Sequence, residues 1–104
     1  MSTIYVVSFA PANDFSGVGG FEWSRVREEA DKVFEEMLAE SKEDRGHIVR
    51  ILEVETDIED DDEVSTWLDA EYLDSIEFEL DPVRQYIPEG TDEDRLPLNR
   101  QNIL

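Results

Sequence analysis

The segment from Ser24 to Ser41, SRVREEADKVFEEMLAES, decides the fold class. Its apolar residues recur one, three or four positions apart, which places them along one side of an α-helix. They are Val26, Ala30, Val33, Phe34, Met37 and Leu38. Ser24 is the expected N-cap, and Gly46 is expected in the turn that follows. The spacing therefore predicts a long amphipathic helix that packs on one face of a sheet.

Segments on both sides of this helix have the composition of strands. Residues 3–9 are β-branched and aromatic and are apolar at both odd and even positions, which is typical of a central strand covered on both faces. Residues 47–55 are rich in Ile, Val and Leu. Pro11 and the glycines between residues 17 and 20 indicate an open connection from the first strand to the helix.

The second half of the chain predicts further elements. A second helix is expected to start near Asp62, with Val64, Trp67, Leu68 and Tyr72 on its inner side. Residues 76–81 alternate apolar and acidic, which predicts a strand that Pro82 ends, and residues 83–87 are expected to add a short strand. The expectation is an α+β domain over residues 1–87, of order β-α-β-α-β, with a three- to four-stranded sheet. Residues 88–104 are expected to form a mobile C-terminal tail.

Composition excludes several classes of protein. The chain has 104 residues and no cysteine, so a disulfide framework, a thiolate metal site and a cysteine nucleophile are excluded. The apolar run from Ile4 to Ala10 is too short to span a bilayer, and no basic segment precedes it, so we expect a cytoplasmic protein without a membrane partner. A formal charge of -19 argues against direct binding to nucleic acid, which is itself a polyanion.

The charge is concentrated in one part of the chain. Residues 51–83 contain no lysine or arginine and carry -14, whereas the other 71 residues carry only -5. We take the acids of this stretch as the candidate partner-binding residues. They are Glu53, Glu55, Asp57, Glu59, Asp60, Asp61, Asp62, Glu63, Asp69, Glu71, Asp74, Glu77, Glu79 and Asp81.

A surface that bears a dozen carboxylates can imitate the phosphates of a short duplex, which carries one charge per about 1.7 Å of axis. The sequence therefore favours a DNA-mimic inhibitor that occupies the basic groove of a nucleic-acid-binding protein. A defence nuclease or effector is the expected partner, and an anti-CRISPR or anti-restriction protein of a phage or mobile element is the expected type. No cofactor is required for inhibition by occupancy.

An alternative is a small non-enzymatic adaptor or regulatory domain whose acidity reflects a halophilic or GC-rich milieu. The scarcity of lysine, with Lys32 and Lys42 against seven arginines, fits this alternative. Such a protein would bind through the Phe15–Trp23 loop or through the tail, because exposed aromatic residues are favoured in interfaces. The sequence leaves the oligomeric state open.

No motif indicates catalysis or a metal site. An EF-hand loop that starts at Asp57 would need Gly and Glu where Asp62 and Leu68 stand. The glycine segment before the helix does not complete a dinucleotide-binding fingerprint, because Glu22 occupies its last position. His47 is the only histidine, so no Ser–His–Asp arrangement can be argued from spacing. We therefore expect a protein that is not an enzyme and has no catalytic residues, metal or cofactor.

Overall fold

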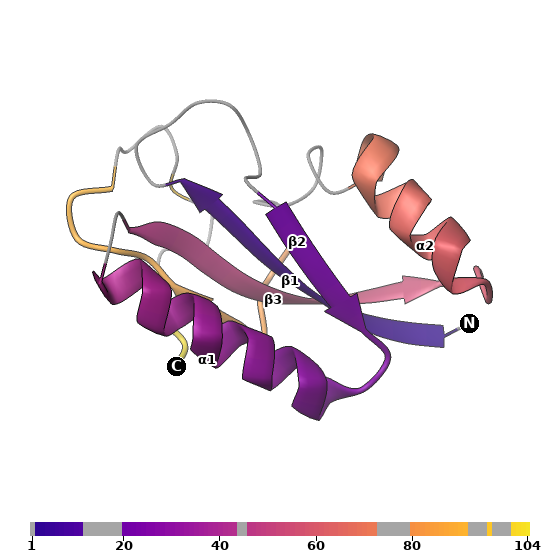
Figure 1. Cartoon of the computed structure of the whole chain (residues 1–104), viewed down its shortest axis with the longest axis horizontal. Coiled ribbons are helices and arrows are strands. Elements are labelled where there is room, and N and C mark those ends of the chain that lie inside the picture. The colour runs from indigo at the N-terminus through magenta and orange to yellow at the C-terminus, as the bar shows by residue number, and fades with distance from the viewer. Residues whose placement is uncertain (1, 12–19, 44–45, 73–79, 92–95, 97–100) are drawn as a thin grey trace.

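The computed structural model describes residues 2–11, 20–43, 46–72, 80–91, 96 and 101–104 (Figure 1). Its four strands form one antiparallel sheet in the order β2-β1-β3-β4, and two helices accompany it, so the fold is α+β. The elements along the chain are β1 (Ser2–Pro11), β2 (Gly20–Ser24), α1 (Arg27–Glu43), β3 (His47–Thr56), α2 (Asp61–Trp67), the π-helical turn η1 (Leu68–Tyr72) and β4 (Arg84–Tyr86).

Strand β1 is central, as the composition of residues 3–9 predicted. It pairs with β3 over its whole length, from Ser2 opposite Thr56 to Pro11 opposite His47. Successive side chains of a strand point to opposite faces, and both faces of β1 are covered. Val6 and Val7 are therefore both buried, although they point in opposite directions.

Each face of the sheet has its own apolar cluster. On one face, α1 packs Ala30, Phe34 and Leu38 onto strand residues that include Val7 and Ile51. These helix residues are four positions apart, so they share one side of α1. On the other face, Val64 and Leu68 pack onto Ile4, Val6, Leu52 and Val54. The α2 region lies at the end of the molecule where β3 ends and β1 begins (Figure 1).

The segment expected as an open connection before the helix instead contains strand β2, so the predicted order β-α-β-α-β lacks one strand. Phe21 and Trp23 alternate along β2 and pack against the cluster on the α2 face. Gly20 stands opposite Phe9 in the sheet. A Cβ at Gly20 would lie 2.6 Å from the Phe9 ring, so the absence of a side chain at this position leaves room for the ring. Residues 12–19 lie outside the described part of the chain.

The start of α1 also differs from the prediction. Helix α1 begins at Arg27, whereas Ser24 is the last residue of β2. The Ser24 hydroxyl accepts a hydrogen bond from the Val26 N–H (3.0 Å) and donates one to the Glu29 carboxylate (2.6 Å). Ser24 therefore stabilises the turn into the helix from a position three residues before it, not as the expected N-cap. After α1, Gly46 has a φ of 73°, a backbone conformation that favours glycine.

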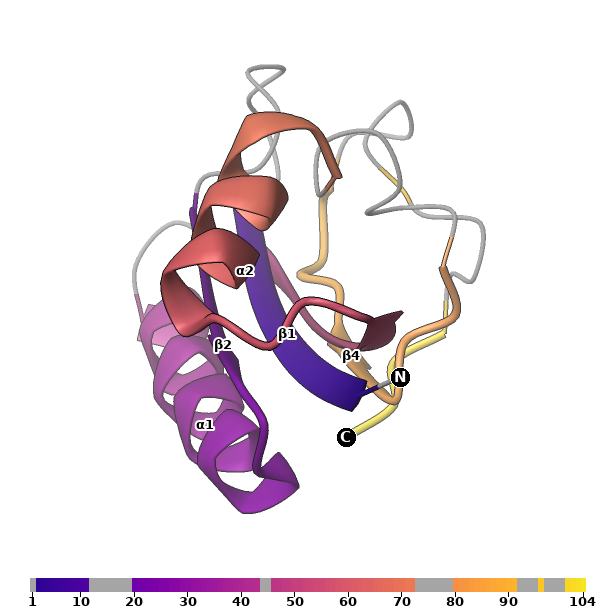
Figure 2. The ribbon, with the colours of Figure 1, turned by 90° about the vertical axis from the view of Figure 1, so that its right-hand side faces the viewer.

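Strand β4 lies in the segment predicted as a short strand at 83–87, and the C-terminal residues lie beside it (Figure 2). Gln85 and Ile103 exchange backbone hydrogen bonds of 2.9 and 2.8 Å, and the Asn102 side chain accepts one from the Ile87 N–H. The strand predicted at 76–81 falls mostly on residues outside the described ranges. Leu80 is described and lies in a bend, partly buried against the α2-side cluster.

Candidate interaction surface

The structure describes the side chains of ten of the fourteen candidate acids, and all ten are exposed. The Glu71 side chain and residues Asp74, Glu77 and Glu79 lie outside the description. The ten exposed acids are Glu53, Glu55, Asp57, Glu59, Asp60, Asp61, Asp62, Glu63, Asp69 and Asp81.

Eight of these acids belong to one continuous stretch, residues 53–63, which we call the acidic segment. Glu53 and Glu55 are two positions apart on β3, so both point to the face on which α1 packs. The segment then leaves the sheet and enters the first turn of α2, which packs on the opposite face. The carboxylates of this segment therefore do not share one flat face. Figure 1 shows the backbone of the segment passing from the end of β3 into α2.

Two acids of the segment also make contacts within the protein. The Asp60 carboxylate caps α2 and accepts hydrogen bonds from the backbone N–H groups of Asp62 (2.8 Å) and Glu63 (3.3 Å). Asp61 forms an ion pair of 3.2 Å with Arg25, from the turn between β2 and α1. Negative charge in the first turn of a helix is also favoured by the helix dipole. Asp60 and Asp61 therefore have structural roles that charge alone did not predict.

Arg25 holds the acidic segment against the rest of the protein. Its guanidinium donates to the backbone carbonyls of Ile58 and Glu59 as well as to Asp61. The same guanidinium lies 5.5 Å from the centre of the Trp23 ring, within the range of a cation–π interaction. One arginine is thus bound between an indole ring and a carboxylate of α2.

Other arginines are also engaged within the protein. Arg84 contacts Asp31 and Glu35 of α1 and lies 4.2 Å from the centre of the Phe34 ring. Arg27 pairs with Asp31 one turn further along α1. These arginines neutralise carboxylates of α1, so the contacts leave the net charge of the protein unchanged.

Arg50 is fully buried in β3, which the sequence reading did not anticipate. Its Nε donates to the Gln85 side-chain oxygen at 2.8 Å, and its Nη2 donates to the Leu80 carbonyl at 2.5 Å. Buried charges require partners of this kind. The available signal was a single arginine inside the apolar run from Ile48 to Leu52.

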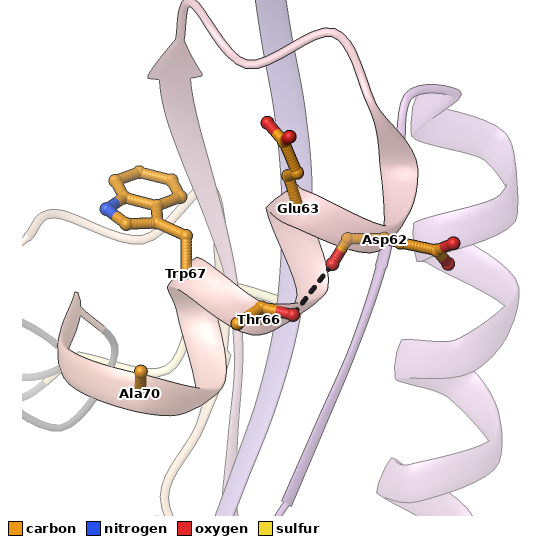
Figure 3. A pocket seen from close by; sticks show the side chains of 5 residues that line it. All are labelled: Asp62, Glu63, Thr66, Trp67 and Ala70. Atoms are coloured by element: carbon orange, nitrogen blue, oxygen red, sulfur yellow. Dashed lines mark hydrogen bonds between the residues drawn. The ribbon is translucent and has the colours of Figure 1, made fainter.

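An apolar hollow of about 370 Å³ lies on the solvent side of α2 (Figure 3). Its described walls are Asp62, Glu63, Thr66, Trp67 and Ala70. Glu63 and Trp67 are four residues apart and project from successive turns of the helix, as do Asp62 and Thr66. The sequence reading had placed Trp67 on the inner side of the helix. The ring is half-buried, contacts the core and also forms a wall of this hollow.

The aromatic residues before the helix are expected to cover the edge of the core, and only the adaptor alternative uses Trp23 as an exposed anchor; the structure agrees with the first expectation for Trp23. The residue lies on β2, packs against the core, and donates its indole N–H to the Ser65 hydroxyl of α2 at 2.9 Å. Phe15 lies outside the described residues. Trp23 therefore attaches α2 to the sheet instead of presenting a free aromatic anchor.

Within the described ranges, no group of three or more His, Asp or Glu residues is arranged to hold a metal ion. His47 begins β3 and lines a smaller hollow of about 160 Å³ with Phe9, Met37 and Glu40. In the part of the chain that the structure describes, no helix is both long and apolar enough to cross a membrane.

Comparisons of the chain with protein-family models, with curated proteins and with solved structures give no match. Its function is therefore inferred from its own residues and their arrangement.

Proposed function

We propose that the protein is an acidic inhibitor that imitates DNA and occupies the basic groove of a nucleic-acid-binding protein, such as a defence nuclease or effector. The observation that carries the proposal is the acidic segment. Eight exposed carboxylates follow one another within eleven residues that contain no base, from β3 into the first turn of α2.

The charges of the acidic segment form rows, although these rows are less dense than the phosphates of a nucleic acid. Two positions on one strand face, such as Glu53 and Glu55, are separated by about 6.8 Å along the strand. A single DNA strand carries one charge per about 3.4 Å of helix axis. A protein whose groove holds rows of Arg and Lys for phosphates would meet a row of carboxylates here, at about half the linear charge density of one DNA strand. Long-range attraction would accelerate the encounter.

The internal use of arginine supports the same proposal. Arg25, Arg27, Arg50 and Arg84 all contact groups of this chain. The acidic segment contains no base of its own, so its charge stays strongly negative after Arg25 neutralises Asp61. Such a surface repels nucleic acid and attracts a basic groove.

The experiment is a capture with competition. The immobilised protein would be exposed to a bacterial lysate freed of DNA, and the retained proteins would be eluted with a salt gradient. We expect a nucleic-acid-binding protein that elutes at raised salt and that free duplex DNA displaces. Retained proteins that ignore duplex DNA would contradict the proposal.

A matched pair of variants locates the surface. The test variant carries Glu53→Gln, Glu55→Gln, Asp62→Asn and Glu63→Gln, which avoids the structural acids Asp60 and Asp61. The control removes the same four charges from the exposed side of α1, at Glu28, Glu36, Glu40 and Glu43. The test variant should lose capture at lower salt than the control. Equal loss in both variants would show that overall charge, and not this segment, attracts the partner.

One observation favours the alternative of an acidic adaptor adapted to its milieu. Helix α1 carries seven acids and three bases, so its solvent side is acidic as well. Charge spread over several surfaces is what salt adaptation requires, whereas a mimic requires charge where it binds. The paired variants separate the two, because milieu-driven acidity gives no preference for residues 53–63.

A further inference from the structure

We propose that the hollow on α2 binds an arginine side chain of a basic protein partner. This inference rests on the proposed function for the identity of the partner, and it names the site that would anchor the complex. It concerns the recognition of one side chain, whereas the acidic segment as a whole supplies attraction.

The first argument is the chemistry of the walls. The lining of the hollow is almost entirely apolar, and Trp67, Ala70 and Thr66 contribute to it together with the acidic residues Asp62 and Glu63. In Figure 3 the Glu63 carboxylate and the Trp67 ring project from successive turns, whereas the Asp62 carboxylate points away from the ring. An apolar floor with a carboxylate at its border suits a side chain that has an aliphatic stem and a cationic head.

The second argument is that the protein already binds an arginine in this manner. Arg25 lies over the ring of Trp23 and pairs with Asp61 of the first turn of α2. The hollow offers the same two kinds of group, an indole ring and a first-turn carboxylate, on the solvent side of the same helix. A second guanidinium would find similar partners there.

The third argument is charge complementarity and the choice of cation. The hollow adjoins the acidic segment, which repels anions and concentrates cations around it. A planar guanidinium stacks on an indole ring and donates two hydrogen bonds to a carboxylate, whereas an ammonium is a strongly hydrated point charge. We therefore expect arginine to be preferred to lysine.

The experiment is a titration of the full chain, labelled with nitrogen-15, with an end-blocked hexa-arginine peptide and then with hexa-lysine. Binding at the hollow should shift the Trp67 indole resonance and the Thr66 and Ala70 amide resonances more than the Trp23 indole resonance. Trp67→Leu keeps an apolar contact with the core and removes the ring. It should weaken hexa-arginine binding by about threefold to tenfold and hexa-lysine binding less.

A second pair of variants keeps the test decisive if Trp67→Leu disturbs the fold. Glu63→Gln and Glu43→Gln each remove one exposed charge, but only Glu63 borders the hollow. Glu63→Gln should weaken hexa-arginine binding more than Glu43→Gln does. Equal effects of this pair, with resonance shifts spread over the whole acidic surface, would overturn the inference.

The two proposals fail separately. If hexa-arginine binds at the hollow but no DNA-displaceable protein is captured, the arginine site stands and the inhibitor proposal falls. If a DNA-displaceable protein is captured and the Glu63 and Glu43 variants behave alike, the inhibitor proposal stands without this anchor.

Discussion

At the scale of single residues, two neighbouring aspartates of the same charge have different roles. Asp60 caps α2 through two backbone N–H groups, whereas the exposed Asp62 side chain lies beside the hollow in the first turn. Asp60→Ala should lower the free energy of unfolding by about 0.5–2 kcal/mol, because it leaves these N–H groups without their acceptor. Denaturant titration measures the loss.

Asp62→Ala is the matched control, since it removes the same charge two residues further along the chain. It should cost less than Asp60→Ala, because it removes only a favourable interaction with the helix dipole, worth about 0.3–1 kcal/mol. Asp60→Ser should restore most of the stability, as serine is also a good cap. Equal losses for the two alanine variants would mean that charge, not capping, is what α2 requires.

Arg50 is expected to be the arginine on which the fold depends most. Arg50→Ala would leave the Gln85 side-chain oxygen and the Leu80 carbonyl without these donors inside the protein. We expect a loss of about 2–5 kcal/mol in the free energy of unfolding, because the truncation leaves two neutral acceptors without these donors and a cavity where a fully buried side chain stood. Arg27→Ala, which breaks a half-exposed pair with Asp31, should cost less than about 1 kcal/mol. Similar losses for both variants would show that burial of Arg50 is not what makes it important.

At the scale of elements, the C-terminal residues complete the edge of the sheet beside β4. Removal of residues 102–104 takes away the Ile103 carbonyl that accepts from the Gln85 N–H, and the Asn102 oxygen that accepts from the Ile87 N–H. Hydrogen exchange at the Gln85 amide should accelerate by about tenfold, which corresponds to the loss of one hydrogen bond. The Val83 N–H, which donates to the Ile51 carbonyl, should stay protected and serves as the internal control. Unchanged exchange at Gln85 would mean that this segment is mobile in solution.

The elements show which parts of the fold can be predicted from a single sequence. Strands β1 and β3 were predictable because their apolar residues occupy consecutive positions, as a two-sided core requires. Strand β2 was missed because the glycines before Phe21 resemble a loop, and because an edge strand of five residues depends on its pairing with β1. The alternation of Phe21 and Trp23 was the available signal.

The candidate surface was predictable in its charge but not in its geometry. Exposure of the acids followed from their residue type, since Asp and Glu are almost never fully buried without a partner. The structural role of Asp61 depends on Arg25, which precedes it by 36 residues and reaches it only after folding. The hollow on α2 likewise depends on how the helix packs against the sheet, which determines that Trp67 contacts both the core and solvent.

At the scale of the whole molecule, the charge that would attract a partner also opposes folding. A net charge of -19 on 104 residues gives repulsion that grows as the chain becomes compact, and dissolved salt screens it. The internal pairs of Arg25, Arg27 and Arg84 relieve only part of this repulsion, because the acidic segment contains no base of its own. The stability of the protein should therefore depend strongly on ionic strength.

We predict that sodium chloride stabilises the protein. Between about 0.02 M and about 0.5 M salt, the screening length falls from roughly 20 Å to roughly 4 Å, which is shorter than most distances between surface charges. The melting temperature should rise by about 4–8 °C, which for a domain of this size corresponds to about 1 kcal/mol.

The variant with Glu53→Gln, Glu55→Gln, Asp62→Asn and Glu63→Gln should melt higher at low salt and respond less to added salt, because its carboxylate repulsion is smaller. If the melting temperature of the wild-type chain does not change with salt, these carboxylates are too far apart to repel one another. The charge density that the mimic proposal requires would then be absent.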